Sequence, residues 1–276
     1  MALSFDSFLK PTAAADFSGV VLDCRFDLAD PSAGKKLHTE GHIPGAQHMD
    51  LEHDLASPAA KNGGRHPLPS PAQFVETLAR LGVGIDTDVL LYDDSSFAFA
   101  ARCWWMMTAL GYQSPSFLAG GFKAWQSAGL PVENGELPPA AEAGSIKAPS
   151  VADSWPGVCS REELREHLAE GACLIDAREP RRYLGEFEPI DPVAGHIPGA
   201  INHPWQEFSD ELGNPRGAAE LMSQWSEIGP DDSAVVYCGS GVTACVNALS
   251  LQLSGRKRPV LYAGSWSDWC SYLPQD

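Results

Sequence analysis

Basic residues are scarce in this sequence. The 276 residues include 19 Lys and Arg against 36 Asp and Glu, so the formal net charge at pH 7 is -17. A surface with this excess of negative charge repels both a nucleic-acid backbone and an anionic membrane. We therefore expect no nucleic-acid partner and no membrane partner.

Long hydrophobic runs and paired cysteines are also absent. The chain has no uncharged apolar stretch of about 18 residues, the length that a spanning helix requires. A secretory signal combines a positively charged start with an apolar run, and the N-terminus lacks this combination. The seven cysteines include no CxxC pair, which disfavours a zinc site or a redox dithiol. These absences predict a cytoplasmic protein without a metal site.

An internal repeat organises what is present. The pentapeptide His-Ile-Pro-Gly-Ala begins at His42 and again at His196. Other segments recur in the same order: 20–25, 89–93 and 119–125 correspond to 173–178, 235–238 and 263–269. One repeat of this length indicates a duplicated domain rather than a solenoid. The predicted organisation is an N-terminal domain at 1–137, a Pro-containing linker at 138–153 and a C-terminal domain at 154–276.

The alternation of apolar runs and helical patterns indicates the fold class. Short apolar runs such as 89–92 and 235–237 are typical of strands buried on both faces of a parallel sheet. Helices are predicted from Ser70-Pro71 to before Gly82, and from the capping box of Ser160 to before Gly171. Each half is therefore predicted to be an α/β domain, a mostly parallel central sheet flanked by helices.

One segment carries the candidate chemistry. The apolar run 235–237 ends at Cys238, and Gly239 and Gly241 follow before a helix-compatible stretch. Glycines permit positive φ values that turn main-chain N–H groups toward the sulfur, and a helix start adds partial positive charge. Such surroundings favour a thiolate and suit a persulfide anion. Cys238 is therefore the candidate nucleophile, although most cysteines at strand ends are structural.

The loop and the repeat together resemble a known family. The sequence CGSGVTA from Cys238 to Ala244, both His-Ile-Pro-Gly-Ala motifs and the closing Gly-Ser-Trp-Ser-Asp-Trp resemble tandem rhodanese-domain sulfurtransferases, particularly those that use 3-mercaptopyruvate. The resemblance implies two rhodanese-like domains, of which the C-terminal one is catalytic. Asp93 stands where the repeat places the equivalent of Cys238, and a carboxylate is a poor nucleophile toward sulfur, so the first half is expected to be inactive.

The resemblance also implies an activity. Sulfur would pass from 3-mercaptopyruvate to Cys238 as a persulfide, with release of pyruvate, and then to a thiol or cyanide acceptor. A thioredoxin-like protein is one acceptor that the family suggests, and no cofactor is implied. The loop residues Gly239, Gly241, Val242 and Thr243 would bind the donor.

Three further site residues follow from the resemblance. Arg182 matches the arginine that binds the anionic donor, and Ser240 would act on its carbonyl with the histidine of the first repeated motif, His42. An alternative for His42 is structural, because His196 recurs in the same motif and both rings could bond their own loops. Neither Asp27 nor Asp30 is selected as the aspartate that would complete the relay.

The donor assignment leaves alternatives open. Many mercaptopyruvate enzymes have a second arginine where this chain has Asp191, so carboxylate recognition is expected to be weaker or differently built. Thiosulfate is the alternative donor, and a slow persulfide carrier or sensor that binds a partner protein is a further alternative. A cysteine phosphatase is disfavoured, because Ala244 occupies the position of its phosphate-binding arginine.

Overall fold

The chain folds into two compact units. The computed structural model describes residues 3–136, 146–150 and 153–274. Most of the expected linker at 138–153 lies outside these described residues. The main boundary between the units falls between Pro156 and Gly157. Unit 1 comprises Met1–Ala56, Pro69–Pro156 and Ser209–Pro215, and unit 2 comprises Ser57–Leu68, Gly157–Phe208 and Arg216–Asp276.

Two short segments belong to the unit opposite to the one that chain order predicts. Residues 57–68 join unit 2, where the N–H of Gly63 donates to Asp268 Oδ1 at 2.7 Å. Residues 209–215 join unit 1, where the N–H of Gly120 donates to the carbonyl of Gly213 at 3.1 Å. Hydrogen bonds thus assign each segment to its unit. The order of the repeated motifs does not predict this assignment.

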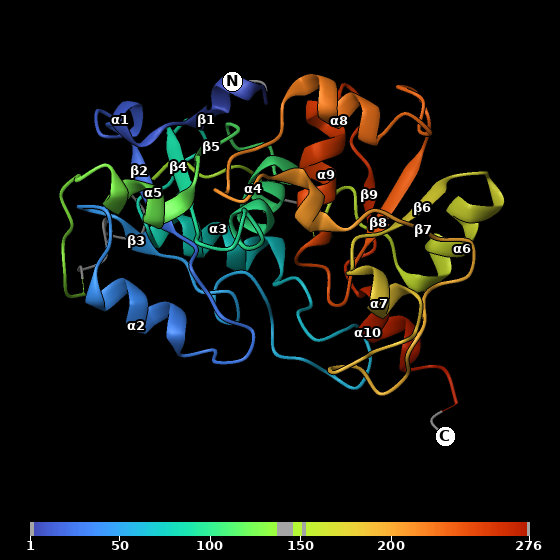
Figure 1. Cartoon of the computed structure of the whole chain (residues 1–276). Helices are drawn as coiled ribbons and strands as arrows, with labels where there is room; N and C mark the ends of the chain where they lie inside the picture. The colour runs from blue at the N-terminus through green and yellow to red at the C-terminus, as the bar shows by residue number, and fades with distance from the viewer. Residues whose placement is uncertain (1–2, 137–145, 151–152, 275–276) are drawn as a thin grey trace. The chain divides into compact units, whose positions relative to one another are not determined.

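Unit 1 is built on a parallel sheet with the strand order β1-β5-β4-β2-β3 (Figure 1). Val20 to Asp23 of β2 pair in register with Val89 to Tyr92 of β4. The elements are η1 (Phe5–Ser7), β1 (Phe8–Leu9), α1 (Pro11–Ala14), β2 (Val20–Asp23), α2 (Ala33–Glu40), β3 (Gln47–His48), α3 (Pro71–Arg80), β4 (Val89–Tyr92), α4 (Ala100–Ala109), β5 (Ser116–Leu118) and α5 (Gly121–Ser127).

Unit 2 repeats this arrangement with the strand order β7-β6-β8-β9, again with parallel pairing. Asp176 lies opposite Tyr237 as Asp23 lies opposite Tyr92 in unit 1. The elements are α6 (Arg161–Ala169), β6 (Cys173–Asp176), α7 (Pro180–Tyr183), β7 (Ile201–Asn202), η2 (Trp205–Phe208), α8 (Ala218–Gln224), β8 (Ala234–Tyr237), α9 (Ala244–Leu253), β9 (Val260–Leu261) and α10 (Ser265–Cys270).

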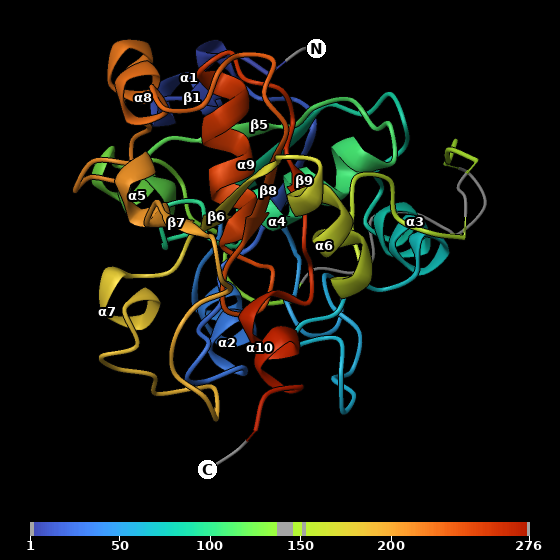
Figure 2. The same cartoon turned by 90° about the vertical axis from the view of Figure 1, so that its right-hand side faces the viewer.

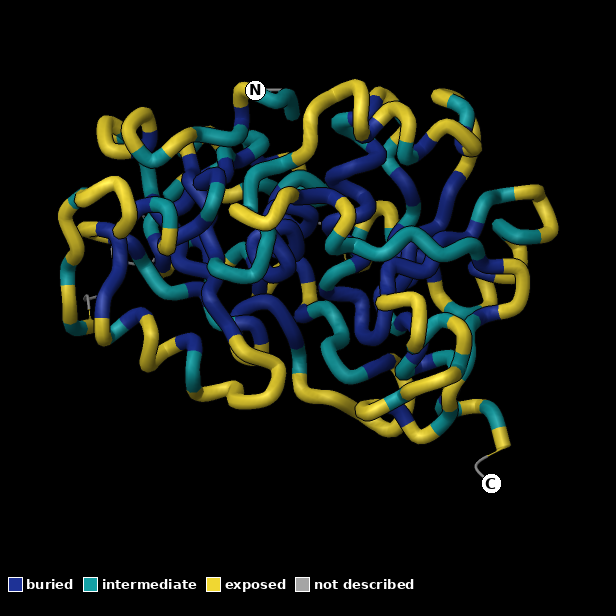
Figure 3. Tube along the Cα trace, viewed as in Figure 1, coloured by how far each residue is buried: buried dark blue, intermediate teal, exposed yellow. Residues whose placement is uncertain are grey.

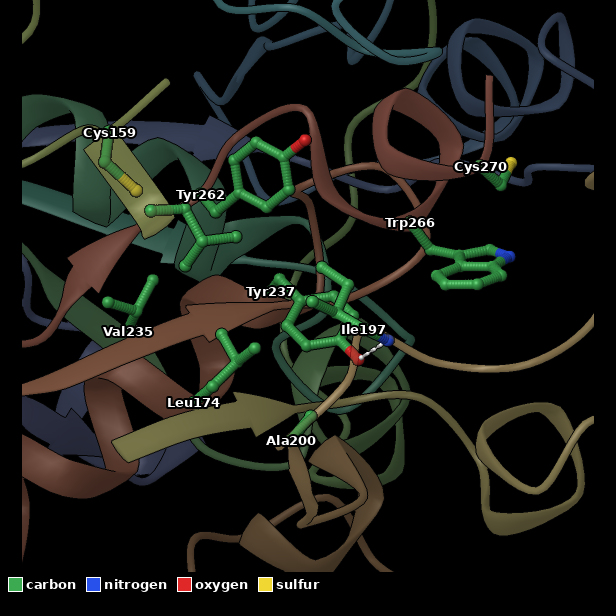
Figure 4. Packing of buried hydrophobic residues seen from close by; sticks show 10 residues of the cluster. Cys159, Leu174, Ile197, Ala200, Val235, Tyr237, Tyr262, Trp266 and Cys270 are labelled. Carbon is green, nitrogen blue, oxygen red and sulfur yellow. Dashed lines mark hydrogen bonds between the residues drawn. The ribbon is translucent and has the colours of Figure 1, made fainter. Parts of the chain in front are cut away.

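Helices cover both faces of each sheet. In unit 2, Leu164 of α6 and Trp266 of α10 pack with Leu174, Val235 and Tyr237 on one face. Figure 4 labels the last four of these side chains. α9 packs along β8 and β9 on the other face (Figure 2). The central strands β4 and β8 are buried at every residue, as Figure 3 shows in dark blue. The predicted α/β class with parallel sheets is therefore confirmed for both units.

The predicted helix starts are confirmed as well. The side chain of Ser70 accepts the N–H of Gln73 at the start of α3, and Ser160 accepts the N–H of Glu163 at the start of α6. These caps satisfy main-chain donors that the first turn of a helix leaves without an intrahelical partner. Both helices end before the predicted glycines.

Candidate active site

The candidate nucleophile Cys238 directly follows the central strand of unit 2. β8 ends at Tyr237 and α9 begins at Ala244, so the loop spans residues 238–243. The hydroxyl of Tyr237 accepts a hydrogen bond from the N–H of Ile197 at 3.1 Å (Figure 4). Cys238 is buried, with 2% of its surface exposed. The strand thus places the sulfur at the carboxyl edge of a parallel sheet, where open α/β proteins bind ligands.

One main-chain N–H of the loop is directed at the sulfur. Gly241 donates to Cys238 Sγ at 3.2 Å. Gly241 has a φ of +79°, and a Cβ atom on it would lie 2.2 Å from the carbonyl oxygen of Ala263. Only glycine fits this conformation and this space. The residue therefore makes the tight turn that brings its N–H to the thiol.

Other N–H groups of the same loop have no acceptor within the described residues. These are the groups of Gly239, Ser240, Val242 and Thr243. They immediately precede α9, whose first turn carries partial positive charge. Main-chain donors at a helix start are suited to an anion. Of the main-chain N–H groups expected to face the sulfur, one contacts the thiol. The others remain as donors that suit a larger anionic group.

The start of α10 holds the loop from its other side. The N–H of Cys238 donates to Ser265 Oγ at 3.1 Å, and the N–H of Trp266 donates to the carbonyl of Cys238 at 3.0 Å. Ser265 has a φ of 57°, a left-handed conformation that costs a side-chain-bearing residue about 1–2 kcal/mol. The closing Gly-Ser-Trp motif therefore serves to position the nucleophile loop.

His66 is a site residue that the sequence alone does not identify. Its Nδ1 lies 2.8 Å from the hydroxyl oxygen of Ser240, two residues after the nucleophile. His66 lies in the segment 57–68, which belongs to unit 2 although it precedes most of unit 1 in the chain. A signal for it does exist: Arg65-His66 is a basic pair within a Gly- and Pro-rich stretch of a chain poor in basic residues. The 174 residues that separate His66 from Ser240 hide the pairing.

His42, the expected partner of Ser240, makes its contacts within unit 1. Its Nδ1 lies 2.8 Å from the carbonyl oxygen of His38, and the two rings stack with centroids 4.0 Å apart. His196 repeats this pattern in unit 2, with Nδ1 2.7 Å from the carbonyl oxygen of Tyr183 and the same stacking distance. These paired contacts favour the structural alternative for His42, and the Ser240 hydroxyl has His66 as its partner.

Arg182 lies beside the nucleophile loop and is bound by carboxylates. Its Nη2 donates to Glu188 Oε1 at 2.7 Å and to Asp191 Oδ2 at 3.3 Å. Burial alone would raise the pKa of Glu188, but hydrogen bonds from Arg182 and the neighbouring main chain hold that pKa below its usual range. A Cβ atom on Gly239 would lie 3.3 Å from Arg182 Nη1. The guanidinium thus borders the residue next to the nucleophile.

Arg178, in contrast, is part of the framework. It is buried, and its Nη2 donates to Asp176 Oδ2 at 2.6 Å and to the carbonyl of Gly195 at 2.7 Å. Arg25 makes the same contact with Asp23, also at 2.6 Å. The recurrence of this contact in both units indicates a structural role for Arg178.

The remaining cysteines fit a packing role. Burial is the main cause that raises the pKa of Cys159 to about 12 and that of Cys270 to about 11, so neither thiol ionises readily. Within the part of the chain that the structure describes, no group of three or more His, Cys, Asp or Glu side chains could hold a metal ion. No helix in that part is both long and apolar enough to cross a membrane.

Known proteins resemble the chain over nearly its full length. The Rhodanese-like domain model matches residues 5–128 and 160–272. A probable 3-mercaptopyruvate sulfurtransferase of Pseudomonas aeruginosa is 46% identical over 261 residues, covering 91% of this chain and 88% of the relative. A putative thiosulfate sulfurtransferase of Mycobacterium tuberculosis is 39% identical over 253 residues, covering 91% and 87%. A solved 3-mercaptopyruvate sulfurtransferase from Leishmania major matches with a TM-score of 0.80 at 28% identity, covering 96% of this chain and 74% of that one.

Proposed function

Because this chain belongs to the rhodanese-like family and is a sulfurtransferase, we propose that it takes sulfur from 3-mercaptopyruvate and carries it on Cys238. The observation that carries the proposal is the hydrogen bond between Ser240 and His66, two residues from the nucleophile. A serine–histidine pair suits a donor whose carbonyl becomes an enolate, whereas thiosulfate has no such carbonyl. The relative at 46% identity bears the name of this activity.

The first half-reaction forms a persulfide. The Cys238 thiolate attacks the donor sulfur, so that a sulfur–sulfur bond forms and the carbon–sulfur bond of the donor breaks. The electron pair passes into the enolate of pyruvate, which takes up one proton and leaves as pyruvate. The loop residues Gly239, Gly241, Val242 and Thr243 surround the outer sulfur in this proposal, and their N–H groups stabilise its charge.

Ser240 and His66 stabilise the departing enolate. With its proton on Nδ1, His66 donates to the Ser240 oxygen and leaves the serine hydrogen directed at the donor carbonyl. Negative charge on that oxygen grows as the carbon–sulfur bond breaks, so the hydrogen bond strengthens in the transition state. Arg182 binds the donor carboxylate, for which a planar guanidinium is well suited.

The second half-reaction returns the enzyme to its starting state. A thiolate or cyanide attacks the outer sulfur of the persulfide, and the Cys238 thiolate leaves toward the N–H of Gly241. Small thiols and a thioredoxin-like dithiol are proposed acceptors of the same chemical class. Cyanide would yield thiocyanate.

Thiosulfate is the second candidate donor. Two arginines, Arg65 and Arg182, approach the residue next to the nucleophile, and paired cations can bind a dianion. The relative at 39% identity is named as a putative thiosulfate sulfurtransferase. Both donors would load the same cysteine.

Loading and turnover distinguish the candidates. The protein is incubated with each donor, Cys238 is examined by mass spectrometry for one added sulfur, and pyruvate or thiocyanate release is followed with a thiol or cyanide acceptor. Repeated pyruvate release with a loaded Cys238 is the expected result. Loading by thiosulfate alone would favour the second candidate, and loading without turnover would favour a persulfide carrier. Cys238→Ser is the control and should remain unloaded.

The roles of the two histidines are separated by a second experiment. His66→Gln and Ser240→Ala should each lower kcat for 3-mercaptopyruvate about 100-fold, the usual effect of losing one such donor. Turnover of thiosulfate should fall much less, because it forms no enolate. His42→Gln should instead lower the Tm, because its ring is buried among contacts of unit 1. A kcat loss in His42→Gln that exceeds the loss in His66→Gln would contradict the assignment.

A further inference from the structure

We infer that Arg65 binds the donor carboxylate together with Arg182, and that Asp191 is a positioning residue that holds the two guanidinium groups in place. The inference deepens the proposed function and rests on it, because it concerns donor binding at the same loop. The substrate class that follows is a carboxylate of the 2-oxo acid type, and binding of an inorganic dianion by the same two cations is the alternative outcome of the tests below.

The main chain of Arg65 is fixed against the nucleophile loop. The N–H of Arg65 donates to Ser267 Oγ at 3.2 Å. The N–H of the same Ser267 donates to the carbonyl of Gly239 at 2.9 Å. Gly64 makes the approach close, since a Cβ atom on it would lie 2.5 Å from the carbonyl oxygen of Gly264. Ser267 thus links Arg65 directly to the residue that follows the nucleophile.

The two guanidinium groups converge on one point. A Cβ atom on Gly239 would lie 3.0 Å from Arg65 Nη2 and 3.3 Å from Arg182 Nη1. Arg65 Nη2 has no hydrogen-bond partner among the described residues, because Asp191 is bound through Nη1. The Arg65 side chain is 30% exposed, so a small anion can reach it. Because residue 239 is a glycine, no side chain occupies the position that faces these two cations.

The carboxylate of Asp191 binds both guanidinium groups and so stabilises their close approach. Its Oδ1 accepts from Arg65 Nη1, and its Oδ2 accepts from Arg182 Nη2 at 3.3 Å. Its own N–H donates to Glu188 Oε1 at 3.1 Å, and its side chain is only 3% exposed. A buried carboxylate between two guanidinium groups offsets their mutual repulsion. The second cation that related enzymes carry at this position is therefore supplied here from a distant segment, with Asp191 as its anchor.

The charges within the arginine cluster are balanced. Three arginines and three carboxylates contact one another, so their formal charges cancel: Arg65, Arg178 and Arg182 with Asp176, Glu188 and Asp191. A single carboxylate can form charge-assisted hydrogen bonds with the exposed edges of two guanidinium groups. Directional hydrogen bonds from Arg65 Nη2 and Arg182 Nη1, rather than net charge, therefore hold the donor carboxylate.

Arg65→Met tests the donor-binding role. Losing a charged hydrogen bond should raise KM for 3-mercaptopyruvate about 10- to 100-fold. The kcat and persulfide formation at saturating donor should remain, whereas the Tm should fall, because the buried carboxylate of Asp191 loses one of its two partners. Arg80→Met is the matched control, since Arg80 also binds an aspartate, Asp54, at 2.8 Å but belongs to unit 1. An unchanged KM in Arg65→Met would overturn the inference.

Asp191→Asn tests the positioning role through donor preference. With one negative charge removed, kcat/KM for thiosulfate should rise about 10-fold, as expected for one unscreened cation beside a dianion. The preference for 3-mercaptopyruvate should fall in proportion. An equal loss for both donors together with a lower Tm would mean that Asp191 serves stability alone, and the positioning role would be rejected.

The parent protein separates failure of the inference from failure of the proposed function. If 3-mercaptopyruvate loads the parent Cys238 and KM in Arg65→Met is unchanged, only the inference about Arg65 fails. If 3-mercaptopyruvate does not load the parent while thiosulfate does, the proposed donor fails and the inference fails with it.

Discussion

The loops that follow β4 and β8 share a backbone plan but differ in the group that their N–H donors surround. In unit 1 the carboxylate of Asp93 accepts four main-chain hydrogen bonds, at 2.8 to 3.0 Å, from the N–H groups of Ser95, Phe97, Phe99 and Ala100. In unit 2 the smaller thiol of Cys238 accepts one, from Gly241 at 3.2 Å. The first loop thus contains its own carboxylate, whereas the N–H groups of Gly239, Ser240, Val242 and Thr243 in the second have no acceptor among the described residues.

The framework beneath the two loops is nearly identical. Asp23 and Arg25 in unit 1 bond as Asp176 and Arg178 do in unit 2, each pair at 2.6 Å. The arginine in each unit also donates to the carbonyl of the glycine that precedes the repeated pentapeptide, at 2.7 Å. Duplication has therefore preserved the parts that hold the sheet and loop together. The difference in chemistry lies in a few side chains placed on that common framework.

The two loops also differ at the position that follows Asp93 in unit 1 and Cys238 in unit 2. Unit 1 has Asp94 where unit 2 has Gly239. Asp94 is a carboxylate that accepts the N–H of Lys123 at 3.1 Å, whereas Gly239 faces the guanidinium groups of Arg65 and Arg182. An anionic donor would meet repulsion in one unit and attraction in the other. The absent thiol is thus one of two differences between the loops that would disfavour sulfur transfer in unit 1.

The largest predicted effect comes from making the second loop like the first. Cys238→Asp removes the nucleophile, so kcat should fall by at least about 10³-fold and no sulfur should load. Pyruvate release and mass spectrometry measure both quantities. Asp93→Cys is the reciprocal change and should gain neither loading nor turnover, because Asp94 remains beside it. A persulfide at position 93 would show that the thiol alone distinguishes the loops.

A second prediction concerns the backbone at the corresponding turn positions. Gly241 and Ser96 both have positive φ values, 79° and 53°. Gly241→Ala should destabilise unit 2 by more than about 2 kcal/mol, since strain adds to a clash with the carbonyl of Ala263. Ser96→Gly should change stability by less than about 1 kcal/mol, because relief of strain and loss of chain entropy nearly cancel. Urea unfolding measures both, and equal effects would contradict the prediction.

The smallest effect is a pH dependence expected from unit 1. Burial alone would raise the pKa of Asp23, but hydrogen bonds from His38 and Arg25 outweigh it and lower that pKa to about 2. A depressed carboxyl pKa stabilises the fold above the unfolded value, near 4, and this contribution is lost as the pH falls toward 2. The amount is about 2 kcal/mol.

Substitution identifies the group responsible for this pH dependence. Asp23→Asn should lower the free energy of unfolding at pH 7 and flatten its fall between pH 4 and pH 2, as measured by urea titration at several pH values. Asp176→Asn breaks the corresponding arginine contact in unit 2. The difference between the two variants in the pH dependence of the free energy of unfolding therefore reports the contact of His38 with Asp23 at 3.0 Å. A slope in Asp23→Asn as steep as in the parent would assign the acid sensitivity to another carboxyl.

Much of the fold could be predicted because it depends on local patterns. The run of apolar residues at 89–92 and 235–237 predicts buried parallel strands, and β4 and β8 occupy these residues. Serines 70 and 160 begin helices as predicted, because capping depends on residues three positions apart. The position of Cys238 at the end of β8 follows from the same local reasoning.

The partners of the nucleophile could not be predicted in this way. Ser240 bonds to His66, and Arg182 shares Asp191 with Arg65. The family resemblance instead directs attention to His42 for the serine and to an absent arginine at position 191. Both missing groups come from residues 57–68, which have no counterpart in the recurring motifs. Their segment belongs to unit 2 because of hydrogen bonds to Ser267 and Asp268, which no sequence spacing encodes.

The sequence by itself determined the duplicated α/β architecture, the loop that presents Cys238 and the absence of a nucleophile at Asp93, since each depends on residues that are neighbours in the chain. Only the tertiary structure decided which histidine contacts Ser240 and which second arginine contacts Asp191. Hydrogen bonds and ion pairs act over about 3 Å of space whatever the separation along the chain, so only folding reveals which distant residues meet.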